Sequence, residues 1–190
     1  MSENRNDTPK WLQYLLYVGV AALVNSLLGI FGLSGLSRWI GLAVNAATIY
    51  LLFMLAGSNP RYKTAAIFYA VALVSGFISN AILGLVGSIC GIVAQYQEYD
   101  AHGELIQTRD PKLADKWTGL FWLQFALSMV MVLLTSVLVA ALVMATNLSE
   151  AVVAPIVTVI AAALGVGLHA LYLCYLNRTI KLLENESVVE

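Results

Sequence analysis

The 190-residue chain has 60% hydrophobic residues, only 11% charged residues and a formal net charge of −1, and its mean hydropathy is +0.82. A soluble domain carries about 25% charged residues, so this composition excludes a soluble globular fold and predicts an all-α integral membrane protein. Lysines and arginines occur singly along the chain. Without a basic patch, we expect no nucleic-acid partner.

The apolar runs predict a bundle of five transmembrane helices in one domain, because a span needs about 20 apolar residues. The first run is too long for the apolar core of a cleaved signal peptide, so we expect it to be a retained span. We place a disordered tail at residues 1–10, the domain at 11–180 with spans at 11–33, 39–57, 64–95, 120–145 and 151–176, and a polar tail at 181–190.

The uncharged stretch at residues 64–95 is the central predicted helix, with small residues recurring along it from Gly76 to Gly91. As a continuous helix it would be about 48 Å long, against a hydrocarbon core of about 30 Å. We therefore expect its continuation and the start of the next helix to leave the bilayer as a hairpin over residues 96–119. The alternative is a re-entrant turn near Ser79 and Asn80. The continuous helix is favoured because neither proline nor a polar cluster marks a turn.

The distribution of basic residues predicts the orientation in the membrane. With five spans, Arg38, Arg109, Lys112, Lys116, Arg178 and Lys181 lie on one side, and Arg5, Lys10, Arg61 and Lys63 on the other. This excess favours a cytoplasmic C-terminus in the cell membrane. The re-entrant alternative places every basic residue except Arg38 on one side.

Polar side chains within the predicted spans form a candidate intramembrane site. The site takes one amide from each of the first four spans and the histidine of the fifth: Asn25, Asn45, Asn80, Gln124 and His169. Polar groups at membrane depth line solute pathways, but they also hold helices together through hydrogen bonds. The sequence leaves both roles open.

Titratable residues cluster where the central helix is expected to enter water. Glu98 and His102 are four residues apart, and so are Asp100 and Glu104, which is a spacing that allows metal chelation from one helix face. The same residues also fit a solvated helix end, which we favour, so we expect no metal and no cofactor. A Ser-His-Asp set, an H-E-x-x-H motif and a phosphate-binding loop are all lacking, so we expect neither catalytic residues nor an enzyme.

The predicted hairpin carries an aromatic stripe of Tyr96, Tyr99 and Trp117, and aromatic anchors of this kind dominate binding at protein interfaces. We therefore expect a non-catalytic multi-pass protein that acts through protein contacts, by self-association or as an accessory subunit of another membrane protein. The alternative is a small-solute transporter or channel lined by Asn25, Asn45, Asn80 and His169. An odd number of spans and the expected lack of a carboxylate at membrane depth count against it.

Overall fold

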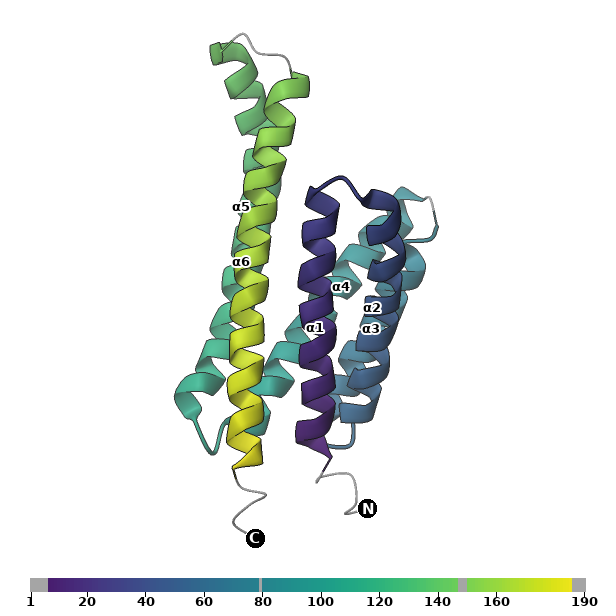
Figure 1. Ribbon diagram of the computed structural model, residues 1–190, viewed down its shortest axis with the longest axis vertical. Helices are drawn as coiled ribbons and strands as arrows, with labels where there is room; N and C mark the ends of the chain where they lie inside the picture. The colour runs from purple at the N-terminus through teal and green to yellow at the C-terminus, as the bar shows by residue number, and fades with distance from the viewer. Residues whose placement is uncertain (1–6, 79, 147–149, 186–190) are drawn as a thin grey trace.

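The computed structural model describes residues 7–78, 80–146 and 150–185, and within these residues all regular structure is α-helical. The fold is a long helical bundle (Figure 1). Its helices are α1 (Thr8–Ile30), α2 (Ser34–Leu55), α3 (Pro60–Ser75), α4 (Ala81–Ile106), α5 (Pro111–Thr146) and α6 (Glu150–Glu184). The all-helical class predicted from composition is confirmed.

Apolar helices of membrane-spanning length mark the chain as an integral membrane protein. Among the described residues, four segments are long and apolar enough to cross a bilayer: Thr8–Gly29, Gly35–Leu55, Ala81–Ile106 and Val157–Glu184. They belong to α1, α2, α4 and α6. Their side chains are mostly unburied, as expected for helices that face lipid over much of their surface.

The continuous helix expected over residues 64–95 is wrong, because the chain breaks between Ser75 and Ala81. Asn80 is the N-cap of α4, and its side-chain oxygen accepts hydrogen bonds from the backbone N–H groups of Ile82 at 2.9 Å and Leu83 at 3.2 Å. Asparagine is among the most favoured N-cap residues. The chain therefore folds back beside Asn80, as in the alternative that the sequence left open.

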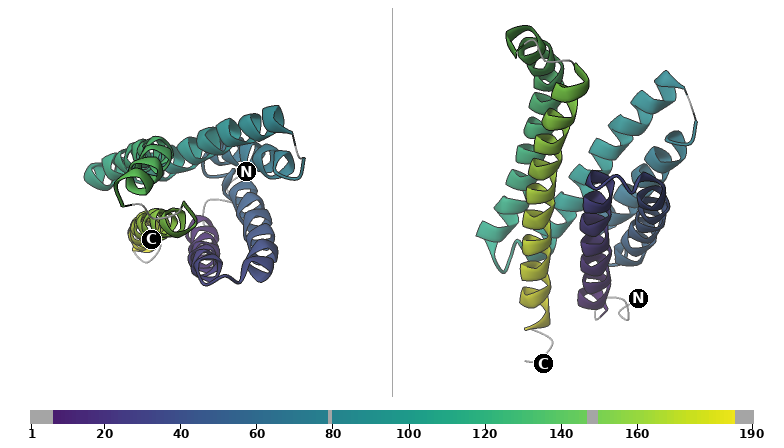
Figure 2. Two further views of the ribbon diagram at one scale, coloured as in Figure 1. Left: turned by 90° about the horizontal axis from the view of Figure 1, so that it is seen from above. Right: turned by 45° about the horizontal axis from the view of Figure 1, so that its top comes forward.

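The six helices form a ring in which each packs against the next in sequence and α1 packs against α6 (Figure 2, left). The start of α1 and the end of α6 lie close to the marked termini, at one end of the bundle. The α2–α3 and α4–α5 turns lie at the same end (Figure 1). We call this the terminal end. The α1–α2 and α3–α4 turns lie toward the other end, and α5 and α6 extend further in that direction.

The most deeply buried side chains lie in the half of the bundle near the terminal end. Trp117, Tyr62, Leu12, Leu52 and Leu55 are all at most 1% exposed. The hairpin expected over residues 96–119 belongs to this core instead of standing apart from it. The apolar side chains on the inward face of this segment pack against other helices. They include Tyr99, Ile106 and Leu113, which are all buried in the core.

Candidate functional site: a buried carboxylate on a cavity wall

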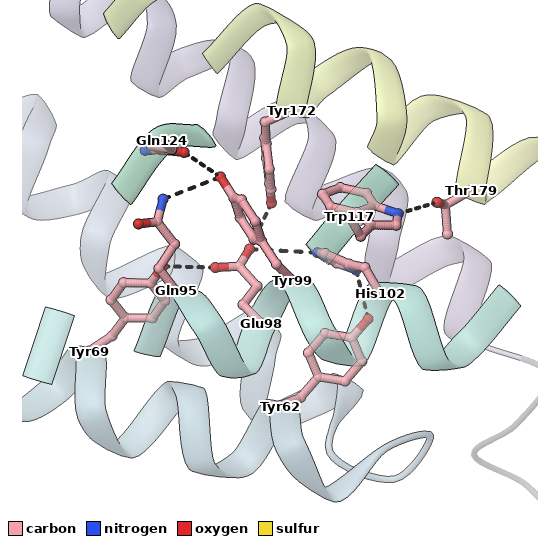
Figure 3. A network of polar contacts seen from close by, with 10 residues as sticks. All are labelled: Tyr62, Tyr69, Gln95, Glu98, Tyr99, His102, Trp117, Gln124, Tyr172 and Thr179. Carbon is pink, nitrogen blue, oxygen red and sulfur yellow. Dashed lines mark hydrogen bonds and ion pairs between the residues drawn. The ribbon is translucent and has the colours of Figure 1, made fainter. Parts of the chain in front are cut away.

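Glu98 is an acidic side chain inside the bundle. It is 4% exposed and accepts hydrogen bonds from two tyrosines on different helices (Figure 3). The Tyr172 hydroxyl of α6 donates to Oε1 at 2.7 Å, and the Tyr69 hydroxyl of α3 donates to Oε2 at 2.9 Å. Hydrogen bonds of this kind to an ionised carboxylate are among the stronger ones in proteins. Glu98 therefore joins three helices.

His102 lies one helical turn beyond Glu98 and is fully buried. Its Nδ1 is 2.7 Å from the Tyr62 hydroxyl, and its Nε2 is 3.6 Å from Glu98 Oε1 with no hydrogen-bond partner among the described residues. The hydrogen bond between Tyr62 and Nδ1 fixes the orientation of the ring, and Nε2 faces the carboxylate.

Trp117 of α5 closes the network on the side of the terminal end. Its ring centroid is 4.6 Å from that of His102, and its indole N–H donates to the Thr179 hydroxyl of α6 at 3.1 Å. Trp117 and Thr179 are both fully buried. The indole therefore separates the carboxylate from the polar surface at the terminal end.

A cavity of about 190 Å³ opens beside Glu98 on the side away from Trp117. All six helices contribute to its wall, which is lined by Leu15, Val18, Gly19, Ala22, Val44, Asn45, Thr48, Tyr69, Gln95, Glu98, Tyr99, Gln124, His169 and Tyr172. The Tyr99 hydroxyl donates to Gln124 Oε1 at 2.9 Å and accepts from Gln95 Nε2 at 3.2 Å. The wall thus combines hydroxyl, amide and carboxylate groups with apolar side chains.

The cavity lies at mid-length of two apolar helices that are candidate spans. Gly19 is near the midpoint of the 23-residue α1, and Asn45 is near the midpoint of the 22-residue α2. His169 Nε2 donates to the Gly19 carbonyl oxygen across a distance of 2.8 Å and so links α6 to α1. The polar wall therefore lies along the middle of two predominantly apolar helices.

A second cavity, of about 260 Å³, adjoins the first between α2 and α3. It is lined by Asn45, Tyr69, Ala72, Leu73 and Gly76, and it shares Asn45 and Tyr69 with the first. Its lining residues follow α3 as far as Gly76, where that helix ends. Beyond Asn45 and Tyr69 its wall is apolar.

Comparison with protein-family models, with curated proteins and with solved structures finds no match to this chain. Function must therefore be argued from the site itself. The described residues contain no group of three or more histidine, cysteine, aspartate or glutamate side chains that could hold a metal ion. What they do contain is one buried carboxylate on the wall of a partly polar cavity.

Three of the five predicted intramembrane polar residues line the cavity, and two do not. Asn45, Gln124 and His169 lie on its wall. Asn80 caps α4 from an exposed position. Asn25 lies in the C-terminal half of α1, where its side-chain oxygen is buried without a hydrogen-bond partner among the described residues and its Nδ2 packs near Gly41.

The aromatic stripe that was predicted to dock a partner is not exposed on the surface of the bundle. Trp117 is fully buried and Tyr99 is 4% exposed. Tyr96 is partly buried and packs edge-to-face on Phe121, with ring centroids 5.2 Å apart. These three aromatic side chains stabilise the inside of the bundle and are not available to anchor a partner in this fold.

Sequence reasoning missed Glu98, Tyr69 and Tyr172 as members of the site. The available signal was a stripe on α4, in which Gly87, Cys90, Ala94 and Glu98 recur at spacings of three and four residues and are all buried. This stripe continues the inward face of the helix up to the carboxylate. It places Glu98 inside the bundle, although charged residues follow it closely in sequence.

Proposed function

We propose that this protein is a small-solute transporter or channel of the cell membrane and that the cavity beside Glu98 is its solute site. The observation that carries the proposal is Glu98 itself, 4% exposed on the wall of a cavity at mid-length of α1 and α2. Ionisable side chains are costly within membrane segments, and where they occur they mark substrate and ion pathways. The expected lack of such a carboxylate was one of the two objections to a transporter.

Burial of the aromatic stripe favours this function over docking. An accessory subunit needs exposed anchors, and Tyr99 and Trp117 are in the core. The described apolar residues with large exposed areas, such as Ile82, Leu85 and Ile89 of α4, then face lipid. Neither catalysis nor a cofactor is part of the proposal.

In this proposal the terminal end is cytoplasmic. Eight described basic residues belong to that end, namely Lys10, Arg61, Lys63, Arg109, Lys112, Lys116, Arg178 and Lys181, whereas Arg38 lies near the α1–α2 turn. Such an excess of lysine and arginine is typical of cytoplasmic loops. Both termini would then be in the cytoplasm, with all six helices in the bilayer or entering it.

The two cavities define the route by which solute reaches the site. Solute enters beside α3 near Gly76, passes Asn45 and Tyr69, and reaches Glu98. Toward the cytoplasm the path is closed by the packed layer of Tyr62, Trp117 and their neighbours. Release requires this layer to open, as in transporters that expose one central site alternately to the two sides.

Uptake by proteoliposomes tests the proposal. Vesicles containing the full-length protein are incubated with an equimolar mixture of small cationic, anionic and neutral solutes, and trapped solutes are quantified by mass spectrometry. We expect at least one solute to accumulate above the level in protein-free vesicles, and Glu98→Gln to reduce that uptake because it removes the charge from the cavity.

Asp115→Asn is the matched control, since it removes one negative charge from an exposed position on α5, outside the cavity. It should preserve uptake. Equal accumulation in wild-type, Glu98→Gln and protein-free vesicles across the whole mixture would contradict the proposed function.

A further inference from the structure

The charge of the cavity wall selects the sign of the ligand. Glu98 is the only aspartate, glutamate, lysine or arginine among the residues that line the cavity. The Arg61 side chain is engaged elsewhere, at 2.8 Å from Asp100 and 2.9 Å from Glu104, and is 36% exposed. Glu98 therefore has no cationic side chain of lysine or arginine beside it within the cavity.

The hydrogen bonds that Glu98 accepts come from uncharged hydroxyls. The Tyr69 and Tyr172 hydroxyls donate to its two oxygens, and His102 Nε2 lies 3.6 Å from Oε1. Hydroxyl donors hold a carboxylate in its ionised form without cancelling its charge. The open side of this carboxylate is the cavity, where a ligand cation would add a counter-charge at short range.

We propose that the cavity binds a small organic cation, an ammonium group on a short carbon skeleton, with Glu98 as its counter-charge. This inference rests on the proposed function and names its substrate class. An anion would be repelled by the carboxylate at close range in a low-dielectric site. A neutral solute would gain no such charge attraction from the carboxylate.

The volume and lining of the cavity favour an organic cation over a metal ion. About 190 Å³ is far more space than one bare metal ion occupies, and the wall contributed by α1 and α2 includes the apolar side chains of Leu15, Val18, Ala22 and Val44. A metal ion would need several oxygen ligands around it at short distances. A carbon skeleton instead fills the apolar side while its ammonium group reaches the carboxylate.

The tyrosines supply the remaining recognition. Tyr69, Tyr99 and Tyr172 all line the cavity, and the Tyr99 and Tyr172 rings stack with centroids 5.4 Å apart. Aromatic rings attract ammonium groups through the negative potential of their faces. The Thr48 hydroxyl and the Gln95, Gln124 and Asn45 amides offer acceptors for N–H groups.

Calorimetric titration of the full-length protein in lipid nanodiscs tests the proposal with butylammonium, butyramide and butyrate, which share one chain length and differ in charge. We expect butylammonium to bind more tightly than butyramide by roughly tenfold or more, and butyrate to show no binding, because only the cation gains the attraction of Glu98. Equal or tighter binding of butyramide or butyrate by the wild-type protein would overturn the proposal without any variant.

Two variants then test whether Glu98 causes the preference for butylammonium. Glu98→Gln should weaken butylammonium binding by roughly tenfold and remove the preference over butyramide, whereas Asp115→Asn should bind as the wild type does. Unchanged discrimination in a folded Glu98→Gln protein would also overturn the proposal. Solute uptake by the vesicles without butylammonium binding would reject the cation site alone, whereas butylammonium binding without uptake would reject the transport function alone.

Discussion

At the scale of single residues, Glu98 shows how an apolar bundle tolerates a carboxylate. Burying an ionised group costs several kcal/mol even after the protein relaxes around it. Hydrogen bonds to charged groups return about 1.5–3 kcal/mol each, and Glu98 accepts two, from Tyr69 and Tyr172. The groups left to offset the remaining cost are His102, whose Nε2 lies 3.6 Å from Oε1, and any ligand in the adjoining cavity.

The Trp117 indole should depend on its single acceptor. Thr179→Val replaces the hydroxyl by a methyl group of similar size and leaves a fully buried N–H without a partner. We expect this change to lower the free energy of unfolding by about 1–3 kcal/mol. Thermal unfolding in detergent, followed by tryptophan fluorescence, measures it.

Thr118→Val is the matched control, because Thr118 is exposed beside Trp117 in sequence. Its effect should stay within about 0.5 kcal/mol. If the two variants unfold at the same temperature, the hydrogen bond between Trp117 and Thr179 contributes nothing to stability.

The sequence places Glu98 in water because acidic residues crowd the end of α4, yet those residues divide between two faces. Asp100 and Glu104 point outward to Arg61. Glu98 and His102 point inward, to tyrosines of α3 and α6. Charge density along the chain does not distinguish the faces, whereas helical spacing does. The partners could not be predicted, because they depend on how distant helices pack.

At the scale of elements, the antiparallel pair of α3 and α4 depends on one glycine. A Cβ atom on Gly87 would lie 2.8 Å from the Ser75 Cβ atom, closer than real Cβ contacts allow. Gly84 and Gly91 have no atom within 4 Å of such a Cβ atom. The glycine series seen in the sequence is therefore a close-packing surface at Gly87 only.

Gly87→Leu should separate α3 from α4, while Gly84→Leu, three residues earlier on the same helix, should be tolerated. Overpacking of this kind costs about 1–3 kcal/mol or more, so we expect a clearly lower unfolding temperature in detergent for Gly87→Leu alone. A greater loss of stability for Gly84→Leu than for Gly87→Leu would show that α3 and α4 pack through a different face.

The sequence carries two signals for the break between α3 and α4. Gly76 and Asn80 bracket the turn, and an asparagine followed by apolar residues is a helix start signal. Continuity of the apolar run argued for one long helix, because hydropathy does not report backbone direction. A short turn between two apolar helices leaves little trace in composition.

At the scale of the whole molecule, the fold-back changes which turns lie at the same end of the bundle. In the six-helix ring the α2–α3 and α4–α5 turns lie together at the terminal end (Figure 1). Five spans would place them on opposite sides. Five spans would divide the basic residues six to four between the two sides. In the ring, eight of the described basic residues belong to the terminal end, and Arg38 alone of those described lies near the other end.

Cysteine labelling in intact cells distinguishes the two arrangements. In a background without Cys90 and Cys174, we expect Ser58→Cys and Gln107→Cys to be equally protected from a membrane-impermeant reagent, and Leu33→Cys, in the α1–α2 turn, to be labelled. Protection of only one of the two positions, Ser58 or Gln107, would restore the five-span arrangement. Labelling of both, with Leu33 protected, would reverse the orientation.

Contact between α1 and α6 has a consequence for biosynthesis. Tyr172 and His169 are both on α6, and they bind groups on α4 and α1. Until α6 has been synthesised and has packed, the Glu98 carboxylate lacks one of its two hydroxyl donors, and the ring of helices is open between α5 and α1. A chain that terminated before α6 would therefore leave both the carboxylate and the inner faces of α1 and α5 without these partners.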